Sequence, residues 1–238
     1  MSGELRERFA RALDAIVADL ATRPDLLGVV FFGSAARGEA KENSDLDLYA
    51  ITGEDTSGSV GRIAAGVSTE TSFASLAQWT ARVREERPTI VHAFATGRPV
   101  LDRTRGGLAA LCEEARTLWD RGPSSPSPAS ILRFRFHLTD LVRDLEEMPE
   151  HSPATALVAS AGIRLALEAQ CAMNRSWMPS LRHALADLQP HWPELIAMVE
   201  RCADAGFPRS LAREVAGSVL LALGGELNTY DTTAAATS

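Results

Sequence analysis

Apolar residues recur at helical spacing near the start of the chain. They lie three or four residues apart, which places them on one face of a helix. These residues are Leu5, Phe9, Leu13, Ile16 and Leu20. The pattern stops at Arg23-Pro24, because proline has no backbone N–H and disfavours the helical conformation in the residue before it. We therefore predict an amphipathic opening helix.

Two segments that follow have the patterns of strands. Leu26 to Phe32 is a short apolar run, rich in β-branched and aromatic residues, that ends at Gly33; buried strands have this length and composition. Asp45 to Ile51 alternates acidic and apolar residues, so its two aspartates point to one face and its leucines to the other. Both segments are predicted to be strands, with a turn or helix start directly after the first.

The remainder of the first half mixes weaker patterns. Val67 to Phe73 contains enough threonine for a third strand, Ser57 to Ser59 marks a loop, and Pro99 to Leu101 fits a short edge strand. Helical spacing returns in three segments. They are Ser75 to Arg84, Thr89 to Ala95 and Leu108 to Leu118.

The composition changes at Gly122 to Ala129, a stretch with three prolines and no apolar periodicity. We interpret residues 122–129 as a linker between a domain at 1–121 and an all-helical bundle domain at 130–227. The helices expected there are Ile131 to Met148, Ala154 to Arg175, Pro179 to Leu188, Pro193 to Ala205 and Pro208 to Leu223. The last residues, 228–238, are expected to be a disordered tail.

Composition narrows the class of protein. With 238 residues, 45% of them hydrophobic, the chain can bury a sizeable core. A formal net charge of -7 argues against long DNA or RNA as a partner. Its three cysteines lack metal or redox spacing and are expected to be reduced. No signal peptide or run of about 20 uninterrupted apolar residues is present, so the cytoplasm, without a membrane partner, is the expected location.

The residues between the first two strands carry the chemistry. Gly33 permits a tight turn that leaves backbone N–H groups free for an anion such as a triphosphate. Ser34 adds a hydroxyl donor and Arg37 a positive charge one turn later. Asp45 and Asp47, side by side on a strand, present the oxygen ligands that magnesium prefers. A third carboxylate from a neighbouring strand would complete a site for phosphoryl transfer.

Each feature alone is common in ordinary turns and strand edges, but their order is specific. The segment from Gly33 to Leu48 reads GSAARGEAKENSDLDL, and it resembles the GSxxxGxxxxxSDxDL signature of the nucleotidyltransferase superfamily. That superfamily includes DNA polymerase β, the aminoglycoside nucleotidyltransferases and the minimal nucleotidyltransferases. The close likeness spans about Val29 to Ile51.

The resemblance implies an α/β fold in which a small mixed sheet flanked by helices precedes a helical half. It further implies that Gly33 and Ser34 grip a nucleoside triphosphate, with Arg37 and Ser44 as further contacts. Asp45 and Asp47 would hold magnesium, in a two-metal site that includes a third acid. In relatives this acid lies on the next strand, where Glu70 is the acid available.

Two choices stay open at this point. Glu54 and Asp55 are rivals of Glu70, although they fall in an expected loop, and Glu168 in the helical half is an alternative general base.

The expected reaction transfers a nucleoside monophosphate, AMP from ATP, to a hydroxyl of a small molecule such as an aminoglycoside, which an acidic protein would attract. Modification of a protein acceptor, and a non-catalytic nucleotide-binding module, are the alternatives.

Overall fold

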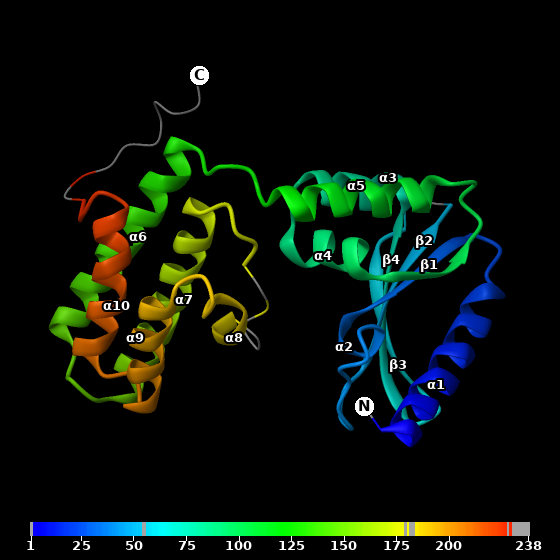
Figure 1. The fold of residues 1–238 in the computed structure, drawn as a ribbon, viewed down its shortest axis with the longest axis horizontal. Coiled ribbons are helices and arrows are strands. Elements are labelled where there is room, and N and C mark those ends of the chain that lie inside the picture. The colour runs from blue at the N-terminus through cyan, green and yellow to red at the C-terminus, as the bar shows by residue number, and fades with distance from the viewer. Residues whose placement is uncertain (1, 54–55, 179, 181–183, 228, 230–238) are drawn as a thin grey trace. The chain divides into compact units, whose positions relative to one another are not determined.

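The chain folds into two compact units, Met1–Arg121 and Gly122–Ser238. The structure is a computed structural model that describes residues 2–53, 56–178, 180, 184–227 and 229. Strands occur in the first unit, whereas the second is helical in its described part (Figure 1). The predicted α/β class, a mixed sheet with helices followed by a helical region, is confirmed.

A mixed sheet forms the frame of the first unit. Its described strands are β1 (Leu26–Phe32), β2 (Leu46–Thr52), β3 (Gly58–Ala64), β4 (Val67–Ser75) and β5 (Arg98–Asp102), in the spatial order β3-β4-β2-β1-β5. β2 runs parallel to β4 and antiparallel to β1. This arrangement brings the end of β1 next to the start of β2, where the signature residues lie.

One face of the sheet is covered by helix α1 (Gly3–Ala21), seen in blue in Figure 1. The helix begins at Ser2, whose side chain accepts a hydrogen bond from the N–H of Leu5, as N-cap residues do. Its apolar side buries Phe9, Leu13 and Ile16 in one cluster with Leu46 and Leu48 of β2. The leucines of the DLDL segment therefore face the core, so its aspartates point to the opposite face.

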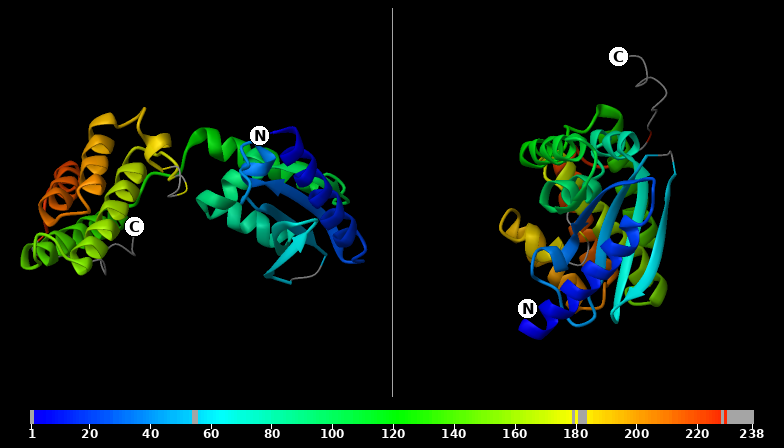
Figure 2. Two further views of the ribbon diagram at one scale, coloured as in Figure 1. Left: turned by 90° about the horizontal axis from the view of Figure 1, so that it is seen from below. Right: turned by 90° about the vertical axis from the view of Figure 1, so that its right-hand side faces the viewer.

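The opposite face carries the helices that follow β4. These are α3 (Leu76–Arg84), α4 (Pro88–Thr96) and α5 (Gly107–Arg121), which lie together along one side of the sheet in Figures 1 and 2. Trp79 of α3 is buried, stacks on Tyr49 of β2 at 4.3 Å and donates from its indole nitrogen to the carbonyl of Ala50. Phe94 of α4 packs edge-on against Trp79 at 5.6 Å. Aromatic contacts thus fix α3 and α4 to the strand that carries Asp47.

The sequence predicts a loop at Ser57 to Ser59, whereas the structure has strand β3 from Gly58 to Ala64. The segment contains two glycines, and nearly all of its residues are exposed, so it carries no alternating apolar pattern. It forms by pairing antiparallel to β4 at the sheet edge, with Ser59 opposite Ser72 and Gly61 opposite Glu70. Hydrogen bonding to a neighbour, which is a non-local effect, overrides its weak local preference for a strand.

The second unit is built from helices that enclose their own core. They are α6 (Pro128–Glu147), α7 (Pro153–Met173), α8 (Ala184–Leu188), α9 (Pro193–Asp204) and α10 (Arg209–Ala222). The predicted helix at Pro179 to Leu188 lies partly outside the described residues, as does the expected tail at 228–238. Leu138, Ala166, Ile196 and Val215 are among the residues of the shared core. Each of α6, α7, α9 and α10 contributes one of them, as expected for a bundle.

Helix α7 is long and apolar enough, by length and composition alone, to cross a membrane, with a mean hydropathy of 1.3 over its best window. A core helix of a soluble protein passes the same test, and α7 lines the core of the helical unit through Ala159, Ala166 and Ala169. It also contains Arg164 and Glu168, which form an ion pair at 2.8 Å. Its composition is therefore weak evidence for a membrane span.

The division between the units falls at Gly122, the first residue of the predicted linker. Gly122 has φ +77°, and a Cβ there would lie 2.2 Å from the carbonyl oxygen of Arg175. Arg175 also donates from Nε to the carbonyl of Pro123 at 3.1 Å. Helix α6 begins at Pro128, three residues earlier than predicted, because the Ser127 side chain caps its first turn.

We expect limited proteolysis to cut first within residues 122–129, since the stretch before α6 has neither regular secondary structure nor apolar anchors. A brief digest with a protease of broad specificity, followed by mass spectrometry of the fragments, tests this expectation. Early cleavage inside α7 instead would contradict the assignment of 122–129 as a linker.

Candidate active site

The turn between β1 and β2 is built around Gly33. It follows Phe32, the last residue of β1, and starts α2 (Gly33–Ala36), a helix of one turn. Its φ of +81° belongs to the left-handed region, and a Cβ at this position would lie 2.3 Å from Oδ2 of Asp47. Glycine is therefore required at position 33 for two reasons, the positive φ of its backbone and the space that the Asp47 carboxylate occupies.

The loop after α2 holds the other two predicted nucleotide contacts, Arg37 and Ser44. Arg37 donates from Nε to Glu39 at 2.9 Å. The Ser44 hydroxyl accepts from the N–H of Lys41 at 2.9 Å, and the N–H of Ser44 donates to the Lys41 carbonyl at 3.0 Å. Ser44 thus closes the loop just before the aspartates, and contact of either residue with a nucleotide stays a prediction.

The sheet brings Asp47 and Glu70 together. β2 and β4 are parallel, and Asp47 is the register partner of Glu70. Register partners on adjacent parallel strands point to the same face and lie about 4.8 Å apart. Asp45 is exposed, directly before β2, and shares this face by alternation. The sequence left open whether Glu70 faces these aspartates; the register turns it toward their face.

The three acids affect one another electrostatically. Partial burial and, to a smaller extent, the charges of Asp45 and Glu70 raise the pKa of Asp47 from 3.8 to about 6, against the opposing effect of Arg37. A carboxylate among like charges is the setting in which a cation stabilises the ionised form. The negative charge at this edge of the sheet is therefore concentrated and incompletely neutralised.

The donor set fits a divalent cation of the magnesium type. Asp45, Asp47 and Glu70 all offer carboxylate oxygens, the ligands of hard cations, and Gly33 leaves the Asp47 carboxylate room. Among the described residues, no group of three or more acidic, histidine or cysteine side chains converges closely enough to hold a metal. Binding would accordingly require the side chains of these acids to turn toward a common point.

Replacement of Asp47 by asparagine is expected to raise the melting temperature in chelator at pH 8. The folded-state pKa lies above its ordinary value of 3.8, so the ionised group costs stability at pH values above about 6. Below about pH 3.8 the carboxyl is protonated in both folded and unfolded states, and the difference disappears. For this half-buried group we expect ~1 kcal/mol after solvent screening. Melting curves of the wild type and the variant from pH 4 to 8 measure the difference in melting temperature. A difference that is the same at pH 4 and at pH 8 would contradict the expectation.

Several other residues considered in the sequence belong to other elements or lie outside the described structure. Glu54 and Asp55, the rivals of Glu70, are outside the described residues. Glu168 belongs to the second unit and pairs with Arg164. The three cysteines are free and buried. None of these observations adds a ligand to the cluster of Asp45, Asp47 and Glu70.

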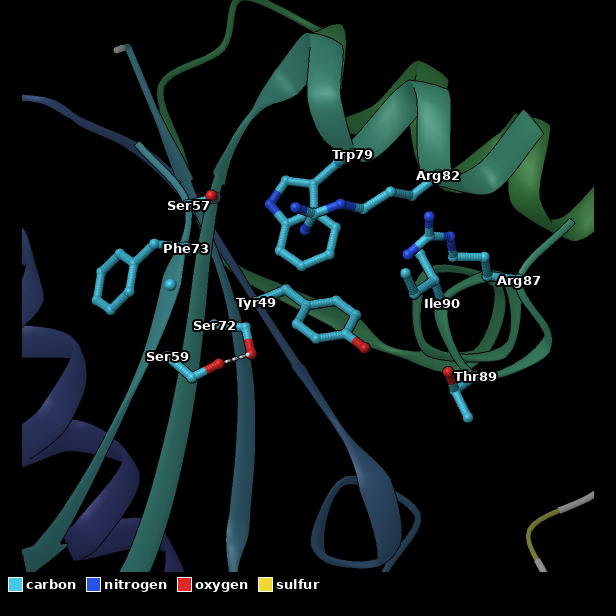
Figure 3. Close-up of a pocket in the computed structure, with 11 residues that line it drawn as sticks. Tyr49, Ser57, Ser59, Ser72, Phe73, Trp79, Arg82, Arg87, Thr89 and Ile90 are labelled. Carbon is cyan, nitrogen blue, oxygen red and sulfur yellow. Dashed lines mark hydrogen bonds between the residues drawn. The ribbon is translucent and has the colours of Figure 1, made fainter. Parts of the chain in front are cut away.

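An open pocket of about 390 Å³, which the sequence does not predict, lies on the face of the sheet that carries Asp47 and Glu70 (Figure 3). Its lining residues come from β2, β4, the segment at β3, α3 and the start of α4. Those used below are Tyr49, Ser59, Ser72, Arg82, Arg87 and Thr89. Alternation along Asp45 to Ile51 could have placed Tyr49 beside the aspartates, but the other positions become neighbours only in the folded sheet.

Comparison with known proteins gives a match over part of the chain. Residues 13–93 match the nucleotidyltransferase domain family, a range that runs from α1 to α4 and includes the whole acidic cluster. The chain is also similar in structure to a nucleotidyltransferase-like protein from Exiguobacterium sibiricum 255-15, with a TM-score of 0.45, 12% sequence identity, and coverage of 89% of this chain and 74% of that one. No curated protein matches the sequence.

Proposed function

We propose that this protein transfers AMP from ATP to a hydroxyl group of a small-molecule acceptor in the cytoplasm and releases pyrophosphate, since residues 13–93 match the nucleotidyltransferase domain family. The proposal depends above all on one observation, the alignment of Asp47 with Glu70 on adjacent strands, with Gly33 against the Asp47 carboxylate. Two-metal phosphoryl transfer requires such a set of oxygen ligands beside a turn that can approach phosphates.

The residues of the first unit divide into two groups by role. Gly33 and Ser34 bind the triphosphate through backbone N–H groups and a hydroxyl, with Arg37 and Ser44 beside them. Asp45, Asp47 and Glu70 hold magnesium, which supplies neutralisation of the phosphate charge when it is bound. For Arg37 to reach the phosphates, its side chain has to leave Glu39, an exposed pair that costs little to break.

Glu70 has a further role at the acceptor. We assign it the proton of the acceptor hydroxyl, whose oxygen forms a bond to the α-phosphorus as the bond from that phosphorus to the pyrophosphate oxygen breaks. A carboxylate is a suitable base when it lies beside the reacting oxygen, and Glu70 is on the strand next to Asp47. Glu168 is the alternative base in the helical unit.

The test is mass spectrometry of reactions that contain each labelled nucleoside triphosphate and a panel of hydroxylated small molecules and proteins, with magnesium or with chelator. We expect a product that carries a nucleoside monophosphate only when magnesium is present. Labelling of proteins alone would identify the acceptor as a protein. Nucleotide binding that is equally tight in chelator would contradict the metal site, because Asp45 and Asp47 repel phosphates until a cation intervenes.

Replacement of Gly33 by alanine is expected to weaken binding of magnesium and ATP by about tenfold, close to 1.4 kcal/mol. The new Cβ would collide with Oδ2 of Asp47 and turn that carboxylate away from its position. Gly38→Ala is the matched control, because Gly38 has a similar φ of +78° but an added Cβ there meets no atom within 4 Å. Both variants lose folding stability through backbone strain.

Calorimetry with ATP and magnesium separates the two effects, since only Gly33→Ala should lose affinity. If Gly38→Ala loses as much affinity as Gly33→Ala, strain in the loop and not displacement of Asp47 is the cause.

A further inference from the structure

The pocket of Figure 3 lies directly beside the acidic cluster. Tyr49 and Ser72 are register partners two residues beyond Asp47 and Glu70 on the same two strands. Two residues of strand span about 6.6 Å, and side chains two apart share a face. Tyr49 and Ser72 both line the pocket. The pocket is therefore within reach of a small molecule whose reacting group lies at Glu70.

The charge of this pocket is opposite to that of the whole protein. Its described lining residues include Arg82 and Arg87 and no acidic residue. The guanidinium of Arg82 lies 4.7 Å from the ring centre of Trp79 and, among the described residues, Arg82 makes no ion pair. Arg87 pairs with Glu85 at 2.8 Å and is more than half exposed. An exposed pair of this kind gives way readily to a ligand.

Neutral donors complete the lining. The hydroxyls of Ser59 and Ser72 lie 2.8 Å apart, drawn as a dashed line in Figure 3. Tyr49 also lines the pocket, and its phenolic hydroxyl is a hydrogen-bond donor. Arg87 is the N-cap of α4 and Thr89 lies in its first turn, so the positive end of that helix also borders the pocket. Guanidinium, hydroxyl and helix N-terminus together suit a carboxylate or phosphate group.

The order of strands separates this pocket from the expected triphosphate position. Gly33 and Ser34 follow β1, on one side of β2, whereas the pocket lies over β2, β4 and β3 on the other side. Asp47 and Glu70, on β2 and β4, lie between the two. A nucleotide held at Gly33 thus leaves the pocket open for the second substrate, and a volume of about 390 Å³ suits a small molecule.

We propose that this pocket binds an anionic group, a carboxylate or a phosphate, of the acceptor, with Arg82 and Arg87 as its specificity-determining residues. The assignment of the bound molecule as the acceptor rests on the proposed function, whereas the anion site itself does not. A polycationic acceptor such as an aminoglycoside, which the net charge of the whole chain favoured, would meet Arg82 and Arg87 at this position and be repelled.

Calorimetric titrations of glycerol 3-phosphate, glycerate and glycerol into the full chain, in chelator and without nucleotide, test the anion site separately from catalysis. The two anionic probes are expected to bind, and glycerol is not. Arg82→Gln and Arg87→Gln should each weaken anion binding at least about tenfold, the scale of one charge-assisted hydrogen bond. Equal binding of glycerol, absence of binding by both anions, or unchanged affinity in both variants would overturn the proposal.

Arg84→Gln is the matched control, because Arg84 lies on the same helix but pairs with Glu114 outside the pocket. It should bind the anionic probes as the wild type does. Arg82→Lys keeps the charge above Trp79 and should recover part of the affinity; melting curves of all variants confirm that they are folded. A loss in Arg84→Gln equal to that in Arg82→Gln would show a general effect of helix charge and overturn the assignment.

Titration of ATP with magnesium into the same variants separates the two sources of a phosphate group. Affinity for ATP should stay within about twofold of wild type in Arg82→Gln and Arg87→Gln. If it falls as far as affinity for glycerol 3-phosphate does, the pocket holds phosphates of the nucleotide and the acceptor assignment is overturned. Absence of nucleotidyl transfer alongside intact anion binding would contradict the proposed function alone.

Discussion

Replacement of Asp47 by asparagine is expected to lower the rate of nucleotidyl transfer by about a thousandfold or more, equivalent to ~4 kcal/mol of transition-state stabilisation. The amide preserves the shape of the side chain and removes the charge that magnesium requires. Asp47 is the acid most enclosed by the site, because Gly33 lies against it on one side and Glu70 on the next strand. Steady-state rates with saturating ATP and any acceptor found in the screen measure the effect.

The matched control for this variant is Asp14→Asn. Asp14 is an exposed residue of α1, the helix that covers the other face of the sheet, so its charge should have no effect on transfer. Melting curves distinguish a chemical loss from misfolding, since Asp47→Asn is expected to be at least as stable as the wild type in chelator at neutral pH. Wild-type turnover in Asp47→Asn would refute the assignment of the carboxylate pair.

Replacement of Glu70 by glutamine is expected to lower turnover by about a hundredfold, the scale for loss of a general base. The register of β2 and β4 places Glu70 on the same face as Asp47. As a base, Glu70 would act on the acceptor oxygen in the transition state and contribute little to nucleotide binding. The KM for ATP should therefore change little while kcat falls. Glu70→Asp, which retains a shortened carboxylate, should recover part of the rate.

The contrary result is equally informative. Nearly normal turnover in Glu70→Gln would mean that Glu70 is a solvent-facing residue of β4, as its exposure alone would allow. The general base would then have to come from elsewhere, and Glu168→Gln is the next variant to measure. A shift of KM for ATP without a change in kcat would instead limit Glu70 to binding of the metal and nucleotide, without a role as base.

The net charge of the chain and the charge of the pocket lead to different acceptors. The formal net charge of -7 favours a cationic partner. The acidic residues are spread over both units, however, and an exposed charge acts only within about a Debye length. Beside Glu70 the described pocket presents Arg82 and Arg87. The local charge therefore has more weight for specificity than the total.

The amino-acid sequence by itself determined the features that depend on local backbone geometry. Period-2 alternation in DLDLYAI predicted that the aspartates share a face, and β2 buries Leu46 and Leu48 as expected. The apolar run at Leu26 to Phe32 is β1 with the predicted bounds. Gly33 predicted the tight turn after β1, because glycine readily adopts the left-handed backbone conformation that this turn requires.

The tertiary structure decided which distant residues become neighbours. Glu70 could have faced either side until the parallel pairing of β2 with β4 fixed the register, since a slip of one residue turns every side chain over. β3 has no apolar pattern of its own and exists through its pairing with β4. The pocket joins Tyr49, Ser72, Arg82 and Arg87 from separate elements. Pairing and register are set by the summed burial of the core, which no local stretch of sequence contains.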